Sequence, residues 1–265
     1  MSKRNLLSGM FLGCLVLSII IYAVFFPDLH SVQAKDAILE GPNSTYFLGT
    51  DHLGRDLFSR LIYGARISIG LAFLSSLVSI FLGFFLGVIA AFFGKFVDGL
   101  ILRGIETILS LPDLLLVILI SLAFGKGFLG LLISLSTIGV AHVTRLVRTE
   151  ALNARQAKFM EASTLLGSGI KKKILLHILP LVTPLIVVTI MYRVPVVIVE
   201  EATISFLGLG IAPPSTSWGL MASETWGFME QFPSLVFLPC LFISLTVLSF
   251  HDLARSIQRK FDRSL

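Results

Sequence analysis

The chain has 265 residues, of which 55% are hydrophobic and only 14% are charged, and its formal net charge is +5. Soluble domains carry charges on about a quarter of their residues, so this composition excludes an ordinary soluble domain and indicates a protein whose solvent is lipid. In a membrane protein the placement of basic residues matters more than their sum, and we expect no nucleic-acid partner.

Six apolar segments are long enough to cross a hydrocarbon layer of roughly 30 Å, which takes about 20 helical residues. In chain order they are about Leu6–Phe26, Ser68–Phe93, Leu100–Phe124, Phe128–Val147, Ile178–Val199 and Phe232–Phe250. The first is too long for a typical signal-peptide core and has no small-residue cleavage site before Pro27, which indicates a retained helix. The sequence therefore predicts an all-α membrane protein with six transmembrane helices.

The Lys and Arg residues between these spans indicate the orientation. With the N-terminus inside, fifteen lie in inner segments, five lie in outer segments and Arg193 remains within the fifth span. Cytoplasmic loops carry such an excess, so we expect both termini inside. This orientation places long loops outside at about 27–67 and 200–231, the latter holding Glu200 and Glu201, and one long basic loop inside at about 148–177.

The first outer loop ends in a string rich in glycine and charge. Gly49 and Gly54 mark turns. Asp56 and Arg60 have the i, i+4 spacing of an ion pair on a helix that leads into the second span. The residues alone predict a capped, salt-bridged interfacial helix.

The inner loop is rich in alanine and charged residues and prone to form a helix up to Leu166, after which Gly167 and Gly169 interrupt it. We expect a short amphipathic helix, a sharp turn and a second short helix. An ordinary solvated loop with a positive-inside cluster remains the alternative, and composition alone favours it.

Two further features break the apolar pattern. The block from Ser205 to Pro214, followed by Trp218-Gly219, has too much Gly and Pro for a continuous helix, so the chain turns or re-enters there. Gly83 and Gly87 form a GxxxG pair, which predicts close packing between helices.

The inner loop resembles the EAA loop of bacterial ABC importer permeases. That pattern is Glu-Ala-Ala, three residues, Gly, nine residues, Ile, one residue, Leu-Pro. Ser163 replaces the second Ala and His177 occupies the Ile position; the matching residues are Glu161, Ala162, Ser163, Gly167, Leu179 and Pro180.

The outer string resembles the second permease subunit of dipeptide, oligopeptide and nickel importers, and the block from Ser205 resembles the same family's outer loop after the fifth span. The residues of the outer string are Gly49, Asp51, Gly54, Arg55, Asp56, Arg60 and Arg66. The resemblance implies the type I ABC importer permease fold. Its parts would be residues 1–67, with the first helix, outer loop and interfacial helix, and a core of five helices at 68–265.

The resemblance also implies partners in a bacterial inner or plasma membrane. These are a homologous permease subunit, two ATPase subunits on which the EAA loop docks, and an external substrate-binding protein. Neither Gly94-Lys95 nor Gly125-Lys126 belongs to a nucleotide-binding Gly-x-x-x-x-Gly-Lys-Ser/Thr loop. We therefore expect ATP and Mg²⁺ on the ATPase subunits and no catalysis or cofactor on this chain. The expected cargo is a peptide, with nickel or a metal chelate as the alternative.

Four ionisable residues in or next to the spans are candidates for the pore lining. Asp113 follows Pro112. It is a candidate for a substrate contact, and the alternative interpretation is a helix break or a pore-facing cap at this position. Arg193 must face water or a carboxylate, and Glu200 and Glu201 are possible partners. An ion-gradient transporter acting through Asp113, Arg193 and Glu200 is a less favoured reading, because the chain shows no internal repeat and few intramembrane charges.

Two other site classes lack support in the sequence. The five histidines show no ligand spacing, which predicts that the chain has no metal site of its own. An intramembrane enzyme would need a nucleophile–base set or metal ligands within the spans, and neither is evident.

Overall fold

The computed structural model describes residues 3–25, 31–34 and 36–262, and over this part of the chain the regular structure is helical apart from one isolated bridge between Thr50 and Asp56. The helices are α1 (Lys3–Phe25), α2 (Leu57–Phe92), α3 (Lys95–Ile108), α4 (Asp113–Phe124), α5 (Phe128–Arg155), α6 (Lys158–Leu165), α7 (Ile170–Lys173), the π-helix η2 (Ile174–Ile178), α8 (Leu179–Phe206), α9 (Trp218–Thr225), the 3₁₀ turn η3 (Trp226–Phe228) and α10 (Ser234–Asp262). The all-α prediction is confirmed.

Five helical segments are long and apolar enough to cross a membrane, and a sixth is added if α3 and α4 count as one span. The span predicted over Leu100–Phe124 is two helices in the structure, because α3 and α4 meet at 93°; the helix break considered next to Asp113 is confirmed. Pro112 lies at the break and precedes the first residue of α4. Proline disfavours helical geometry in the residue before it, which explains why the helix stops there.

The other spans differ from their predicted bounds mainly by being longer. α2 begins at Leu57, with the Asp56 side chain accepting a hydrogen bond from the Ser59 backbone N–H. The expected interfacial helix and second span are therefore one helix, and the division placed after residue 67 lies inside it. α8 continues to Phe206, which puts Glu200 and Glu201 in a helix rather than in the outer loop. Residue 26, the predicted end of the first span, lies outside the described residues.

Close packing of α2 on α5 forms the centre of the fold. A Cβ on Gly83 would lie 2.7 Å from the Val143 side chain, and one on Gly87 would lie 2.8 Å from Val147, so both positions need glycine. Ser79 strengthens the contact by donating a hydrogen bond to the Ser136 carbonyl (3.1 Å). The predicted role of the glycine pair in helix packing is confirmed.

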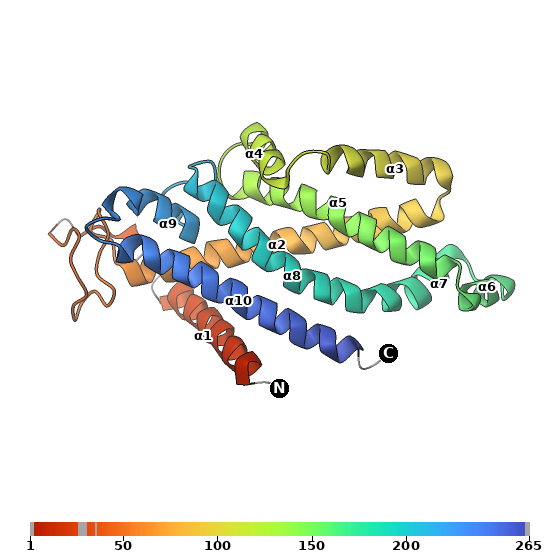
Figure 1. Cartoon of the computed structure of the whole chain (residues 1–265), viewed down its shortest axis with the longest axis horizontal. Helices are drawn as coiled ribbons and strands as arrows, with labels where there is room; N and C mark the ends of the chain where they lie inside the picture. Colours follow the sequence, from red (N-terminus) through yellow and green to blue (C-terminus); the bar gives the residue numbers. More distant parts are fainter. Residues whose placement is uncertain (1–2, 26–30, 35, 263–265) are drawn as a thin grey trace.

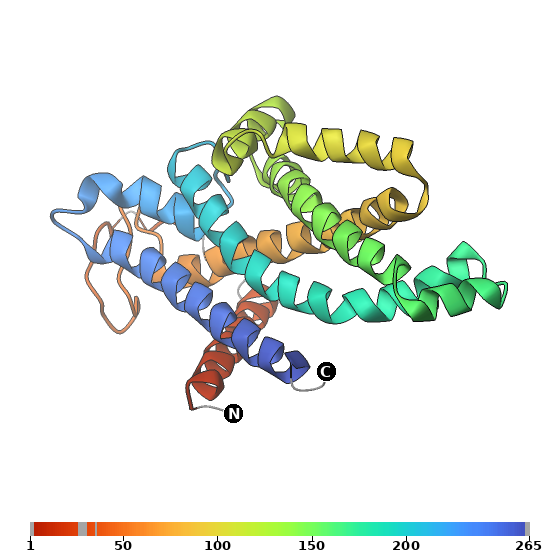
Figure 2. The same cartoon turned by 45° about the vertical axis from the view of Figure 1, so that its right-hand side comes forward.

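Figures 1 and 2 show α2, α5, α8 and α10 running along the long axis, with α1 beside α10. The α6–α7 hairpin lies at one end of the molecule. The outer loop 31–56 and α9 lie at the opposite end, where Trp218 of α9 is fully buried and donates from its ring N–H to the Leu61 carbonyl (3.0 Å). The two motif-bearing segments of the sequence therefore occupy opposite ends of one helical body.

Candidate functional site

The predicted helix–turn–helix in the inner loop is confirmed, and it connects directly to two long helices. Only two residues separate the end of α5 from α6, while α7 runs through the π-helix into α8. At the turn Gly167 has φ +72°, and the Ser168 N–H donates to the Ser163 carbonyl (3.0 Å). A left-handed glycine with such a bond is a common helix end. We call residues 158–173 the coupling hairpin.

One face of the coupling hairpin packs inward and the other is bare. Met160 is buried against the apolar cluster formed with α5 and α8. Glu161 and Ala162 are exposed, and the side chains of Leu165 and Leu166 are each 84% exposed. Two neighbouring leucines with this much exposed apolar surface are costly in water, so this tip has the character of a contact surface.

Side-chain contacts hold the two arms of the hairpin together. His177 Nε2 lies 3.2 Å from Ser163 Oγ, the His177 and Phe159 rings are 5.7 Å apart, and Lys173 Nζ donates to Thr164 Oγ1 (2.9 Å). The two residues that depart from the EAA pattern, Ser163 and His177, therefore contact each other. Leu179 and Pro180 of the pattern begin α8 and are exposed.

The inner end of α5 is tied to α2 and α3. The Arg148 guanidinium forms a two-pronged ion pair with the Asp98 carboxylate of α3, with one N–O distance of 2.6 Å. Arg155 donates to the Ala91 carbonyl of α2 and lies over the Phe92 ring, 5.3 Å from its centroid. The end of α5 next to the hairpin is therefore fixed to both α2 and α3.

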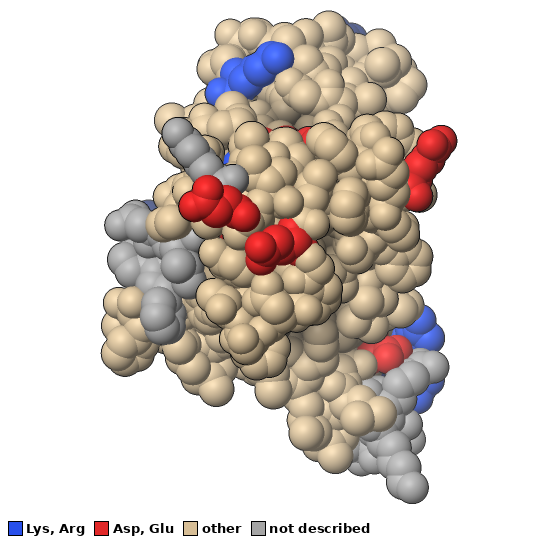
Figure 3. Space-filling model, turned by 90° about the vertical axis from the view of Figure 1, so that its left-hand side faces the viewer, with Lys and Arg blue, Asp and Glu red and all other residues tan. Residues whose placement is uncertain are grey.

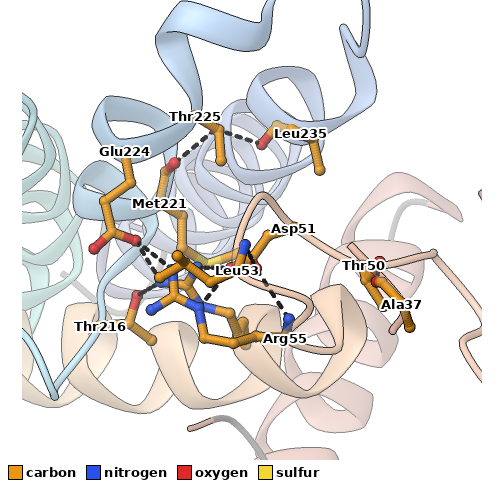
Figure 4. A network of polar contacts seen from close by, with 11 residues as sticks. Ala37, Thr50, Asp51, Leu53, Arg55, Thr216, Met221, Glu224, Thr225 and Leu235 are labelled. Carbon is orange, nitrogen blue, oxygen red and sulfur yellow. Dashed lines mark hydrogen bonds and ion pairs between the residues drawn. The ribbon is translucent and has the colours of Figure 1, made fainter. Parts of the chain in front are cut away.

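The outer loop is fixed to α2 and α9 by a buried network of charges (Figure 4). Asp51 accepts from Arg55 Nε (2.7 Å) and from Arg60 Nη1. Glu224 of α9 accepts from Arg55 Nη2 (3.0 Å) and Arg60 Nη2 (2.7 Å), and Arg60 also donates to Thr216 (3.1 Å). Only 2% of the Arg60 side chain and none of the Asp51 side chain is exposed. Two arginines and two carboxylates therefore join three parts of the chain.

The electrostatics of this network favour an ionised Asp51. Burial alone would raise the pKa of Asp51, but the Arg60 charge, the Arg55 N–H and charge, and the Leu53 N–H hold that pKa below its ordinary value of 3.8. A lowered carboxyl pKa adds stability that is complete above the unfolded-state pKa and is lost as the pH falls through the folded-state pKa. The contribution of Asp51 to stability is thus intact at neutral pH and disappears only below about pH 3.8.

The structure corrects one pairing within the outer motif. Asp56 and Arg60 do not form the predicted i, i+4 ion pair, because Asp56 caps α2 and Arg60 reaches Asp51 and Glu224 instead. Gly49 (φ +83°) and Gly54 (φ +71°) form the predicted turns. Arg66 is exposed on α2, away from this network.

Glu201 belongs to a second buried network in which hydroxyl groups replace cations. Ser68 of α2 donates to its Oε2 (2.8 Å) and Ser205 donates to its Oε1 (2.7 Å). The Ser205 oxygen in turn accepts from the Ile211 N–H (3.2 Å), which holds the turn that follows α8. Glu201 is thus tied to Ser68 and Ser205 rather than to Arg193.

Arg193 pairs with Glu200, one of its two predicted partners. Its Nη2 lies 3.5 Å from Glu200 Oε2 and donates to the Leu135 carbonyl of α5 (3.1 Å). Asp113, at the start of α4, lies with its carboxylate 3.6 Å from His142 Nε2 of α5. That Asp113, Arg193, Glu200 and Glu201 line a pore stays a prediction.

Sequence reasoning missed Glu224, Thr216 and His142 as site residues. The charges of the two outer loops could have indicated the Glu224 contact. The loop at about 200–231 has glutamates and no Lys or Arg, whereas the loop at about 27–67 carries three arginines. For His142 the sequence signal was its position relative to a turn. Asp113 precedes the tight turn at 125–127 and His142 follows it at a similar distance along the chain, so two helices that fold back at this turn bring them close together. Among the described residues no group of three His, Cys, Asp or Glu side chains is arranged to hold a metal ion.

Comparison with known proteins places this fold. Residues 80–265 match the family model described as binding-protein-dependent transport system inner membrane component. The glutathione transport system permease protein GsiD of Pectobacterium atrosepticum is 32% identical over 258 residues, covering 96% of this chain and 86% of the relative. The dipeptide transport system permease protein DppC of Bacillus subtilis is 33% identical over 276 residues, covering 99% and 83%.

A solved structure shares the fold at lower identity. The crystal structure of an amino acid ABC transporter with histidines superposes with a TM-score of 0.59 at 18% identity, covering 77% of this chain and 94% of the other. Together with the apolar helices and the EAA-type hairpin, these matches identify the chain as a multi-pass bacterial membrane protein that belongs to the family of binding-protein-dependent transport system inner membrane components.

Proposed function

We propose that this chain is one of two homologous permease subunits of an ATP-driven importer whose cargo is a peptide. The observation that carries the cargo class is the similarity over nearly the whole chain to permeases named for dipeptide, oligopeptide and glutathione transport. Those names favour a peptide over nickel or a metal chelate.

The energy source in this proposal lies on other polypeptides. ATP and Mg²⁺ bind two ATPase subunits, consistent with a sequence that has no Gly-x-x-x-x-Gly-Lys-Ser/Thr run. A substrate-binding protein delivers cargo to the outer end, which Figure 3 shows as a mostly uncharged surface with isolated charged groups.

The coupling hairpin supplies the mechanical link. Its exposed face around Glu161 and Ala162 docks on an ATPase subunit, and ATP-driven closure of the ATPase dimer moves α6. Because α6 continues into α5 on one side and through α7 into α8 on the other, both long helices follow. ATP shifts the inward- and outward-facing populations only by its different affinity for the two states, so a hairpin that does not dock leaves hydrolysis without transport.

The test is a pull-down of the tagged transporter in mild detergent, with peptide uptake measured in cells. Ala162→Trp adds a large side chain on the exposed face, where the fold itself has room. We expect this variant to fold, to lose the co-purified ATPase and to lose ATP-dependent uptake of glycyl-leucine. Gly167→Pro, whose ring excludes a positive φ, should do the same.

Ala212→Trp is the matched control, since Ala212 is also exposed but lies in the outer segment between α8 and α9. It should retain the ATPase. The proposal is overturned if no ATPase co-purifies with the wild type, or if uptake persists after ATP depletion and stops on adding an ionophore.

A further inference from the structure

Three consecutive lysines mark the place where the coupling hairpin joins α8. Lys171, Lys172 and Lys173 make up most of α7, and the helical run continues without a break through η2 into α8 (Figure 1). Lys173 donates to Thr164 of α6 (2.9 Å). Lys171 and Lys172 are exposed, and neither forms an ion pair with an acid in the described part of the chain. Two ammonium groups are therefore open to a partner of opposite charge.

The sequence around these lysines supplies no acid of its own. No Asp or Glu occurs between Ala162 and Val199, a stretch that includes all of α7 and most of α8. The nearest acid along the chain is Glu161, which is exposed on α6. Because like charges on neighbouring residues repel one another, the lysine run keeps a local excess of positive charge that an anion would relieve.

The turn that follows the lysines exposes large apolar side chains. Leu175 and Leu176 are 61% and 58% exposed, and they belong to the run Ile170–Phe206, which is long and apolar enough to cross a membrane. Each leucine follows one of the two exposed lysines by four residues, which places each lysine and its leucine on a common face of the helix. The apolar side chains therefore lie one turn closer to the membrane interior than the ammonium groups.

This order of charged and apolar groups fits a phospholipid. The excess of basic residues places the hairpin at the cytoplasmic side, where the leaflet has a negative surface potential that attracts basic segments next to a span. A phospholipid carries its phosphate directly above its acyl chains, so one molecule meets both the lysine and the leucine one turn below. The positive-inside rule requires the charges but not the exposed leucines beneath them. An acidic protein surface would pair with the lysines and leave the leucines without an apolar partner.

We propose that Lys171 and Lys172 bind the headgroup phosphate of an anionic phospholipid in the cytoplasmic leaflet. Leu175 and Leu176 pack against the acyl chains of the same lipid. The site lies on the second arm of the coupling hairpin and at the entry to α8, so a bound lipid fixes that arm at the membrane surface. This site goes beyond the proposed function, because it depends neither on the cargo nor on the ATPase.

The test measures lipid binding to the tagged chain, purified in an uncharged detergent with the subunits that accompany it. The probe is dye-labelled phosphatidylglycerol, followed by fluorescence anisotropy, and phosphatidylcholine with the same chains and dye is the comparison without net charge. The wild type should bind phosphatidylglycerol more tightly. Lys171→Gln and Lys172→Gln change exposed side chains, so both variants should fold. Each should bind phosphatidylglycerol about fivefold more weakly and bind phosphatidylcholine like the wild type.

Three further variants separate charge from position and from apolar contact. Lys172→Arg keeps the charge and should keep tight binding, since a guanidinium also pairs with phosphate. Lys126→Gln removes the charge of an exposed lysine in the turn between α4 and α5, at the outer end, and should bind both lipids like the wild type. Leu176→Ser should weaken the binding of both lipids alike, because the acyl contact does not depend on the headgroup.

The proposal is overturned if Lys171→Gln and Lys172→Gln bind phosphatidylglycerol as tightly as the wild type, or weaken the two lipids equally. It is also overturned if these variants lose a co-purified subunit and keep lipid binding, which assigns the lysines to an acidic protein surface. Displacement of the probe by inorganic phosphate as readily as by unlabelled phosphatidylglycerol would assign the site to free phosphate. None of these results bears on peptide import, which the pull-down and uptake measurements test separately.

Discussion

The two ends of the molecule are built on opposite physical principles. At the outer end, Asp51, Arg60 and Glu224 are withdrawn from water and pair with one another, which fixes a long irregular loop to α2 and α9. At the inner end, the coupling hairpin exposes Leu165 and Leu166 and is held by single hydrogen bonds and ring contacts. The outer motif therefore maintains a shape, and the inner motif offers a surface.

This difference shows that a recognisable motif need not be a contact site. Most charged residues of the outer string bind other groups within the chain, and these contacts hold the outer loop and α9 in position. In the EAA-type loop, by contrast, the side chains of Glu161 and Ala162 are exposed and accessible to another molecule. Substitutions should accordingly affect folding at the outer end and coupling at the inner end.

The largest expected effect comes from Arg60→Ala at the outer end. It leaves Asp51 without its strongest partner and Glu224 with only Arg55, and removing one member of a buried ion pair costs roughly 3–5 kcal/mol. We expect a corresponding fall in the free energy of unfolding, measured by denaturant titration in detergent, together with low yields of folded protein.

Arg66→Ala is the matched control, because Arg66 lies less than two turns further along α2 and is exposed. Its effect should stay within about 0.5 kcal/mol. Equal stability of the two variants would mean that the buried network contributes nothing to the fold, and the contrast between the two ends would fail.

A pair of glycines with nearly the same backbone geometry gives the next largest difference. Gly54 (φ +71°) lies in the outer loop, where a Cβ would come 2.1 Å from the Ala34 carbonyl oxygen; Gly167 (φ +72°) has no atom within 4 Å of that position. Gly167→Ala should cost about 1–2 kcal/mol for the left-handed conformation alone. Gly54→Ala should cost about 1–3 kcal/mol more because the neighbouring backbone must move.

Denaturant titration of both variants measures the difference. Gly167→Asn should recover much of the loss at the hairpin, since asparagine tolerates the left-handed region, whereas Gly54→Asn should be no better than Gly54→Ala. Equal losses of unfolding free energy at the two glycines would show that the outer loop adjusts to an added side chain as easily as the hairpin does.

The sequence predicted what depends on local pattern and missed what depends on packing between distant segments. Apolar length located the spans, and glycine located the turn at Gly167. The Pro112 break was foreseen as a possibility, but the 93° angle was not, because it depends on how α3 and α4 pack on α2 and α5. The partner of Arg60 was assigned wrongly because i, i+4 spacing takes no account of Glu224, 164 residues away.

The smallest expected effect tests how firmly the hairpin is braced. Ser163→Ala and His177→Ile, which restore the EAA pattern, each remove the Ser163–His177 contact. A single hydrogen bond contributes about 0.5–1.5 kcal/mol, so each variant should speed hydrogen exchange at the amides of α6 by about twofold to tenfold, as expected for easier local opening.

The double variant should exchange no faster than the faster single variant, since the same contact is lost in all three. Thr183→Ala is the control, because that hydroxyl donates to the Leu179 carbonyl of its own helix, and exchange in α6 should be unchanged. If the two effects are additive, Ser163 and His177 act independently, and the hairpin is then positioned by the packing of Met160 rather than by this bond.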